Sequence, residues 1–265
     1  MTNTPEKMTA APQANYGIDA PGVVAGMFLM GGMGLALAVC IGLFPWHGHA
    51  LVGTIRRTAE VYGGLFVGMA CYMLYWSKVA KIRGRERLLD LVPWSGGEFV
   101  LDVGCGRGLL LLAAATRLRA GRAIGIDIWQ ARDQLGNCIQ ATLANAAIEG
   151  VRDRIQVLTA DMRNLPFKDG SFDVVVSHWA VHNLYASSDR SRALAEMARV
   201  LKPGGYILLA DIQFRVEYRS QFLALGFEGV RNIVSQPRDA ILAVLTFGNF
   251  RPAVTIARKM FNRSA

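Results

Sequence analysis

The run Phe99-Val-Leu-Asp-Val-Gly-Cys-Gly-Arg-Gly108 contains the pattern that decides the fold of this chain. Residues 99–103 are apolar apart from Asp102 and favour a buried strand, and the Ala- and Leu-rich residues 109–118 favour a helix. Three glycines lie between them at alternate positions, Gly104, Gly106 and Gly108. Glycine tolerates the backbone angles of a tight turn and lets a ligand approach the main chain closely. A strand, a glycine turn and a helix N-terminus in this order predict a cradle for a nucleotide-like cofactor.

Strand-like and helix-like segments alternate from residue 96 onward. Strands are expected at 99–103, 123–126, 155–158, 174–177, 206–210, 230–234 and 254–257, and helices at 109–118, 139–149, 190–200 and 218–225. This alternation predicts an α/β fold of the Rossmann-like, doubly wound kind, with a mostly parallel seven-stranded sheet covered on both faces. Such sheets bind ligands at the carboxyl ends of their strands.

The composition points to a membrane in the first part of the chain. Hydrophobic residues make up 52% of the 265 residues and gather before residue 77. Residues 22–44 contain no charged side chain, and as a helix they would measure about 34 Å, enough for a hydrocarbon core of about 30 Å. A second apolar run, extended to about 59–76, is shorter, and an interfacial or re-entrant helix is its alternative. We therefore expect a disordered N-terminus at 1–20 and a transmembrane hairpin at 21–77, and we disfavour a signal peptide because the leader lacks a basic region.

Small residues recur at four-residue spacing in both apolar segments. The pairs are Gly22/Gly26, Ala38/Gly42 and Gly64/Gly68. This spacing lets helix backbones approach closely in lipid, and it would serve either the hairpin itself or a homo-oligomer.

A basic connector at 78–95 joins the hairpin to the domain at 96–265. Its cations are Lys78, Lys81, Arg83, Arg85 and Arg87, whereas the loop between the apolar segments has Arg56 and Arg57. The positive-inside bias therefore places both ends of a two-span chain in the cytoplasm, at an inner or plasma membrane. The net charge of +9 would suit nucleic acid, but a basic cluster directly beside a span favours anionic lipid head groups.

Polar side chains follow several of the expected strands. Asp127 ends the second strand, nineteen residues after Gly108, Asp161-Met162 follows the third, and the loop Ser177 to Tyr185 follows the fourth. An acid at the end of the second strand accepts hydrogen bonds from the ribose of an adenosine cofactor.

Taken in order, these pieces resemble the class I S-adenosylmethionine-dependent methyltransferases over residues 83–260, in particular the subgroup that methylates small molecules, quinones and sterols. The matching segments are Leu101-Asp-Val-Gly-Cys-Gly-Arg-Gly108, Gly125-Ile-Asp127, Ala160-Asp-Met-Arg-Asn-Leu-Pro-Phe167, Phe172-Asp-Val-Val-Val-Ser177 and Leu201-Lys-Pro-Gly-Gly205. The resemblance implies S-adenosyl-L-methionine as the cofactor. It also implies contacts to the methionine part from Asp102 and the glycine loop, to the ribose from Asp127, and to adenine from Asp161 and Met162. Ile128 and Trp129 would cover the other face of the adenine, although Trp129 would equally suit ordinary packing, and Cys105 and Ser177 complete the expected cofactor set.

Methyl transfer from an activated sulfonium needs chiefly positioning, and a base only where the acceptor carries a proton. His182, His178 and Tyr185 are the candidate catalytic residues, with a structural role as the alternative for each. The two histidines do not predict a metal site, because no acid or third histidine completes one. The four cysteines show no paired spacing, so we expect no disulfide framework.

The sequence therefore favours a membrane-anchored methyltransferase acting on a small hydrophobic or lipid-like acceptor at the cytoplasmic face. Two alternatives stay open. One is a methyltransferase for a small soluble thiol, amine or metalloid. The other is a non-catalytic membrane assembly factor that binds S-adenosylmethionine.

Overall fold

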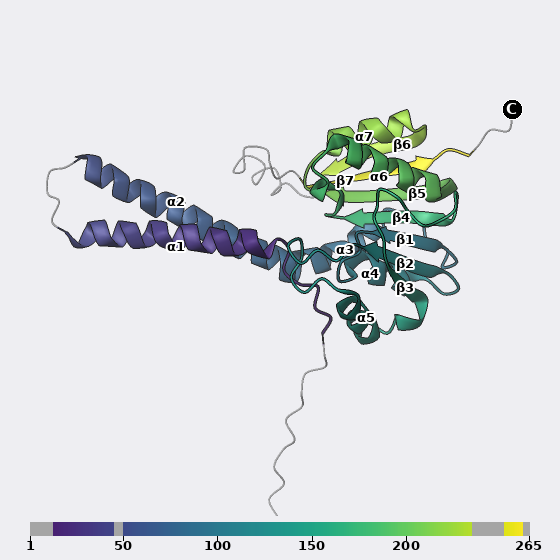
Figure 1. Cartoon of the computed structure of the whole chain (residues 1–265), viewed down its shortest axis with the longest axis horizontal. Helices are drawn as coiled ribbons and strands as arrows, with labels where there is room; N and C mark the ends of the chain where they lie inside the picture. The colour runs from purple at the N-terminus through teal and green to yellow at the C-terminus, as the bar shows by residue number, and fades with distance from the viewer. Residues whose placement is uncertain (1–12, 45–49, 235–251, 262–265) are drawn as a thin grey trace, which may run out of the picture.

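The computed structural model describes residues 13–44, 50–234 and 252–261, which form a helical hairpin joined to an α/β domain (Figure 1). The hairpin consists of α1 (Pro21–Leu43) and α2 (Ala50–Tyr75), and it projects away from the sheet. Pro21 stands at the first position of α1, where its missing N–H costs no hydrogen bond. The second helix begins at Ala50, nine residues before the expected start, so it also includes Arg56 and Arg57.

The two helices approach each other most closely at glycines other than those expected from spacing. A Cβ on Gly63 would lie 2.9 Å from the Leu35 nitrogen, and a Cβ on Gly31 would lie 2.9 Å from the Gly63 oxygen. By contrast, a Cβ on Gly64 would meet nothing within 4 Å, and the same is true of Gly22, Gly26 and Gly68. The prediction that those four glycines pack the hairpin is therefore wrong, while Ala38 is buried as expected.

Among the described residues, α1 is the one helix that is long and apolar enough to cross a membrane. Its large apolar side chains, such as Leu29 and Met33, are largely exposed. The half of α2 nearer the tip of the hairpin carries charged side chains instead, and in this half Arg56 Nε lies 3.0 Å from Glu60 Oε1. The expectation of two spans is thus supported for the first helix only.

The connector to the domain is helical. After α2 the chain makes one π turn, η1 (Trp76–Ala80), in which the Lys81 N–H bonds to the Trp76 carbonyl, and then continues as α3 (Lys81–Leu89). The helix therefore runs without a break from the hairpin into the domain, where Leu89 is fully buried.

The domain contains a seven-stranded sheet of order β3-β2-β1-β4-β5-β7-β6. Its strands are β1 (Phe99–Val103), β2 (Arg122–Asp127), β3 (Ile155–Thr159), β4 (Phe172–His178), β5 (Leu201–Asp211), β6 (Phe227–Val234) and β7 (Ala253–Lys259). The first five are parallel, and β7 is antiparallel to both β5 and β6. The sheet is therefore mixed, with a strand order that reverses between β1 and β4, where open α/β sheets form their ligand crevice.

Helices cover both faces of the sheet. The chain also forms α4 (Leu109–Arg117), α5 (Ile139–Ile148), α6 (Ser187–Val200) and α7 (Arg215–Ala224), and short 3-10 turns η2 (Arg152–Arg154) and η3 (Val181–Asn183). One core joins α3, α4 and α5 to the sheet residues Val100 and Val176. The other joins α6 and α7 to Leu101 and Val175, the alternate positions of the same strands. These two cores fix the carboxyl ends of β1, β2 and β4 at one edge.

Candidate active site

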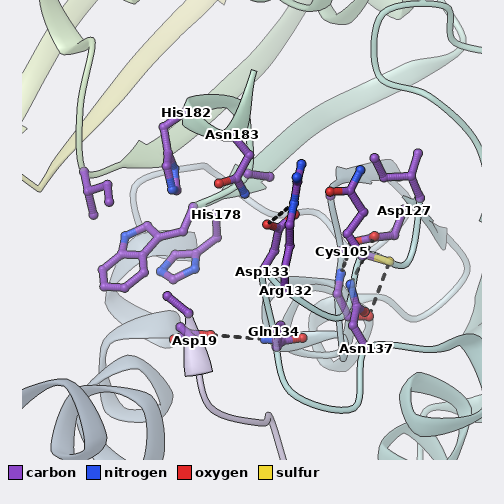
Figure 2. Close-up of a pocket in the computed structure, with 18 of the residues that line it drawn as sticks. Asp19, Cys105, Asp127, Arg132, Asp133, Gln134, Asn137, His178, His182 and Asn183 are labelled. Carbon is purple, nitrogen blue, oxygen red and sulfur yellow. Dashed lines mark hydrogen bonds and ion pairs between the residues drawn. The ribbon is translucent and has the colours of Figure 1, made fainter. Parts of the chain in front are cut away.

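A cavity of about 920 Å³ lies at the carboxyl ends of β1, β2 and β4 and reaches the base of the hairpin. Three parts of the chain line it. The domain contributes the glycine turn and the loops after β2, β3 and β4, the segment before α1 contributes Asp19 and Ala20, and the hairpin and the helical connector contribute residues up to Lys81. Figure 2 shows His178 and His182 on one side of this cavity and Asp127 and Asn137 on the other.

The glycine turn requires glycine at two positions. Gly104 has φ +73° and Gly106 has φ +50°, values that L side chains rarely adopt. A Cβ would lie 2.3 Å from the Ala180 Cβ at the first position and 2.7 Å from Gln134 Oε1 at the second. Gly108 has φ +89° and caps α4 rather than lining the cavity. The turn thus keeps main chain, not side chain, at the cavity wall.

Asp127 holds this turn in place from the end of β2. Its Oδ2 accepts the Gly106 N–H at 2.8 Å, and its Oδ1 accepts the Trp129 N–H at 2.7 Å and Asn137 Nδ2 at 3.2 Å. The carboxylate also lines the cavity. It therefore has the position expected for a ribose ligand and an additional role in ordering the loop.

Two buried oxygens at the cavity wall have no hydrogen-bond partner among the described residues, Asp102 Oδ1 and Asn137 Oδ1. Buried polar atoms of this kind normally have a partner. Burial, assisted by the nearby Asp127 charge, raises the pKa of Asp102 to about 8. Both oxygens are hydrogen-bond acceptors, so the wall fits a ligand that brings donors, such as the ammonium and ribose hydroxyls of S-adenosylmethionine.

The residues expected around adenine divide into two groups. Met162 and Ile128 line the cavity, and so does Asp161, whose carboxylate pairs with Arg163 at 2.6 Å. The hydrogen bond from Arg163 lowers the pKa of Asp161, so this acid is ionised. Trp129 instead donates from Nε1 to Thr159 Oγ1 at 2.8 Å and packs against the core, which is the ordinary-packing alternative.

Two further cofactor candidates are buried beside the turn. The Ser177 hydroxyl donates to the Val103 carbonyl at 2.7 Å and joins β4 to β1 away from the cavity wall. Cys105 lines the cavity, and burial raises the pKa of its thiol. We therefore assign Ser177 a structural role, while Cys105 contributes a neutral apolar surface.

His182 forms a dyad with an acid that sequence reasoning missed. Its Nδ1 lies 2.5 Å from Oδ1 of Asp211, the last residue of β5, and the Asp211 carboxylate also accepts the Tyr218 hydroxyl at 3.1 Å. Burial lowers the pKa of His182, but the Asp211 charge and hydrogen bond outweigh it, so the net pKa is raised. Asp211 is a polar residue at the carboxyl end of a strand, the same signal that identified Asp127.

His178 has different surroundings. Burial lowers its pKa to about 4, so the ring is neutral near pH 7. The ring stacks on Trp179 with centroids 5.3 Å apart, and Trp179 stacks on Trp76 of η1 at 5.2 Å. Trp179 has φ +53°, which is uncommon for a non-glycine residue. The third catalytic candidate, Tyr185, lies at the rim with 85% of its surface exposed.

Residues 13–20 form a strap that packs onto the domain, which contradicts the expectation of disorder for this part of 1–20; residues 1–12 lie outside the described ranges. Tyr16 is buried and hydrogen-bonds to Glu149 of the segment after α5. Asp19 accepts Gln134 Nε2 at 3.2 Å, a contact drawn in Figure 2. Since Gln134 also accepts the Arg107 N–H of the glycine turn at 2.9 Å, the strap is connected to the cofactor loop.

Three of the five basic connector residues contact this strap: the exposed Lys78 donates to Asn15 Oδ1 at 3.2 Å, and Lys81 and Arg85 are the other two. Lys81 is buried, and its Nζ lies 2.7 Å from Asp19 Oδ1 and 3.0 Å from the Tyr16 carbonyl oxygen. Burial lowers the pKa of Lys81, and Asp19 opposes that shift. Arg85 pairs with Glu149 at 2.8 Å. The expectation of lipid contact is therefore wrong for Lys81 and Arg85, while Lys78, Arg83 and Arg87 are exposed.

Comparisons with known proteins agree with this geometry. Residues 101–209 match the family described as "Methyltransferase domain". Methyltransferase GfsG of Streptomyces halstedii is 37% identical over 134 residues, which are 50% of this chain and 44% of that protein. A demethylmenaquinone methyltransferase of Symbiobacterium thermophilum is 34% identical over 132 residues, 49% of this chain and 48% of that protein. The chain thus spans less than half the length of these two relatives.

A solved structure shares the fold. Geranyl diphosphate C-methyltransferase from Streptomyces coelicolor, in complex with S-adenosyl-L-homocysteine, superposes with a TM-score of 0.53 at 17% sequence identity, covering 67% of this chain and 76% of that chain. The glycine turn, the unpartnered acceptors at the cavity wall and the matching relatives agree. Residues 101–209 therefore match a methyltransferase domain, and the cavity beside them fits S-adenosylmethionine.

Proposed function

We propose that this chain is a membrane-associated methyltransferase that moves the methyl group of S-adenosylmethionine to a small hydrophobic or lipid-like acceptor. One observation carries the proposal: a single cavity is lined both by the glycine turn and by the apolar hairpin base. A soluble acceptor would need no apolar helices at its binding site. Relatives named for a demethylrifamycin and a demethylmenaquinone support a small-molecule acceptor.

The cofactor would lie against the glycine turn. Asp102 Oδ1 would accept from its ammonium, Asp127 and Asn137 would face the ribose, and Met162 and Ile128 would enclose the adenine. The sulfonium supplies an already activated methyl group. The residues around it therefore act by orienting the two reactants and excluding water.

His182 is placed to accept a proton from the acceptor. The Asp211 carboxylate fixes Nδ1 as the protonated nitrogen, so Nε2 is the free basic nitrogen. Because the pKa of His182 is raised, it is a stronger base than free imidazole, although a smaller fraction is unprotonated near neutral pH. His178, neutral and stacked, would shape the acceptor site rather than exchange protons.

We further propose that α1 anchors the chain in a membrane with the domain on the cytoplasmic side. Exposed Lys78, Arg83 and Arg87 follow the hairpin along η1 and α3, and positive charge beside a span favours the cytoplasmic face. The charged half of α2 nearer the tip would then lie near the opposite interface, since the 16 residues 61–76 form about 24 Å of apolar helix.

Comparative lipid extraction tests the proposal. Cells that lack the gene, cells with the wild-type gene and cells with the Asp127→Ala variant are extracted and analysed by mass spectrometry. We expect an apolar species heavier by one methylene in wild-type cells, replaced by its unmethylated precursor in the other two. A methylated species found only among water-soluble metabolites would instead support the alternative with a soluble acceptor.

A hairpin replacement tests the role of the helices. The Asp19 nitrogen lies 3.1 Å from Ser77 Oγ, so a short Gly-Ser linker in place of residues 22–75 would keep the strap and Trp76 together. This variant should bind S-adenosylmethionine with unchanged affinity, which also reports its folding, and should lose transfer to acceptor embedded in vesicles. Undiminished transfer would refute a role of the hairpin in presenting the acceptor.

A further inference from the structure

We propose that the hairpin end of the cavity is a subsite for a single-chain amphipathic molecule with an uncharged, oxygen-bearing head. In this subsite the indole N–H of Trp76 donates a hydrogen bond to a head oxygen, and apolar side chains of α1 and α2 contact the chain. The inference rests on the proposed function and specifies its acceptor, because this subsite and the glycine turn belong to one cavity.

Trp76 is fixed in place and has an unused donor. Its ring stacks on Trp179 with an interplanar angle of 2°. Its Nε1 is buried and has no hydrogen-bond partner within the described parts of the chain. A buried N–H without an acceptor is costly, so an oxygen of a bound molecule would stabilise this position. Trp94 offers a contrast, since its Nε1 donates to the Leu89 carbonyl at 2.7 Å, away from the cavity.

The wall beside Trp76 is apolar and adaptable. Val23 and Met27 of α1 and Met69 and Met73 of α2 line the cavity there. Methionine is unbranched and flexible, and it adjusts to irregular apolar partners. A hydrocarbon chain of variable conformation fits such a wall better than a rigid polar molecule does. The opposite end of the same cavity carries His182 and Asp102, so the head must point toward the domain and the chain toward the hairpin.

Charge at the cavity disfavours a phosphate head. The lysine and arginine side chains that line the described cavity are all paired with carboxylates. Lys81 pairs with Asp19 at 2.7 Å, Arg132 with Asp133 at 3.4 Å, and Arg163 with Asp161 at 2.6 Å. An anionic head would have to break one of these pairs or remain unpaired near Asp102 and Asp211. A hydroxyl or carbonyl head needs only a hydrogen bond, which Trp76 supplies.

Binding measurements on the full chain in phosphatidylcholine nanodiscs test this subsite. The probes are 4-decylphenol, 4-methylphenol and decyl phosphate, each competing with tritiated 4-decylphenol in the presence of S-adenosylmethionine. The Trp76→Phe variant keeps an aromatic ring but lacks the N–H, and it should bind 4-decylphenol roughly five- to tenfold more weakly, as expected for one neutral hydrogen bond. Its affinity for S-adenosylmethionine should not change.

Two controls complete the design. Trp94→Phe removes an indole N–H outside the cavity and should leave 4-decylphenol affinity unchanged. Met73→Trp should weaken binding of the decyl probe more than that of 4-methylphenol, because it fills the space of the chain. Equal affinity of wild type and Trp76→Phe for 4-decylphenol would overturn the subsite. Decyl phosphate binding as tightly as 4-decylphenol would overturn the uncharged head. Loss of S-adenosylmethionine binding by the wild-type chain would count against the proposed function instead.

Discussion

Binding of S-adenosylmethionine should release a proton from Asp102. Burial raises the pKa of this carboxyl to about 8, so at pH 7 roughly nine of ten molecules hold the proton. The cofactor brings an ammonium group, and an adjacent cation favours the ionised carboxylate. Binding at pH 7 should therefore release about 0.9 proton, and the affinity should rise roughly tenfold between pH 6 and pH 7.

Titration calorimetry in two buffers of different ionisation enthalpy measures this proton directly. The apparent binding enthalpies should differ by about 0.9 times the difference between the buffer enthalpies. Asp102→Asn should abolish the difference and weaken binding, whereas His182→Asn should retain the difference. Identical enthalpies in the two buffers for the wild-type chain would refute the assignment of Asp102 as the protonated partner of the ammonium.

The same carboxyl should affect the stability of the empty protein. Its pKa in the folded chain lies above the ordinary aspartate value of 3.8, so the folded chain holds the proton more tightly than the unfolded chain. The free energy of unfolding should therefore fall as the pH rises from about 4 to about 8, by up to about 4 kcal/mol at pH 7. Asp102→Asn should flatten this dependence in chemical denaturation curves, and an unchanged slope would contradict it.

Three further variants test the dyad, the strap and the hairpin. Asp211→Asn removes the charge that raises the pKa of His182, so the rising limb of the pH–rate profile should move to lower pH. The rate should also fall by about 10²- to 10³-fold, with cofactor affinity unchanged. A rising limb that does not move would exclude His182 as the base. Lys81→Met should lower stability by about 1–3 kcal/mol and expose Tyr16 to chymotrypsin, whereas Arg87→Met should do neither. Gly63→Leu should lower the thermal stability of the hairpin by about 1–3 kcal/mol through overpacking, and Gly64→Leu should be neutral; equal effects would contradict the observed helix contact.

The sheet could be predicted because each strand is marked by residues that are adjacent in the sequence. The expected strand at 99–103 agrees with β1, and the other six expected strands fall inside observed ones. Short apolar runs bounded by polar or glycine residues are buried on both faces in a parallel sheet, so composition alone identifies them. The candidate residues Asp102, Asp127, Met162 and His182 were found in the same way, as polar or loop positions at strand ends, and all four line the cavity.

The strap and the dyad were not predictable from local patterns. The strap joins Asp19 to Lys81, 62 residues apart, and the dyad joins His182 to Asp211, 29 residues apart. The polar composition of residues 13–20 resembles that of a disordered leader, since no local signal records a partner so distant. In the hairpin, the four-residue spacing of glycines occurs on more than one helix face, so spacing alone did not select Gly63 over Gly64.

The side of the hairpin that faces the cavity depends on how many residues the continuous helix contains between α2 and the domain, and the π turn between α2 and α3 holds one residue more than an α turn would. Its i to i+5 bond aligns Lys81 with Trp76 along the helix, which brings the cation to the strap and the indole to the cavity from one side. Removing one residue from Trp76–Ala80 would convert the π turn into an α turn and rotate the hairpin by only a few tens of degrees, because five residues of a π turn and four of an α turn each make about one full rotation. Removing one residue from the regular helix α3 would instead rotate the hairpin by about 100° relative to the sheet and swing the methionine wall away from the methyl donor.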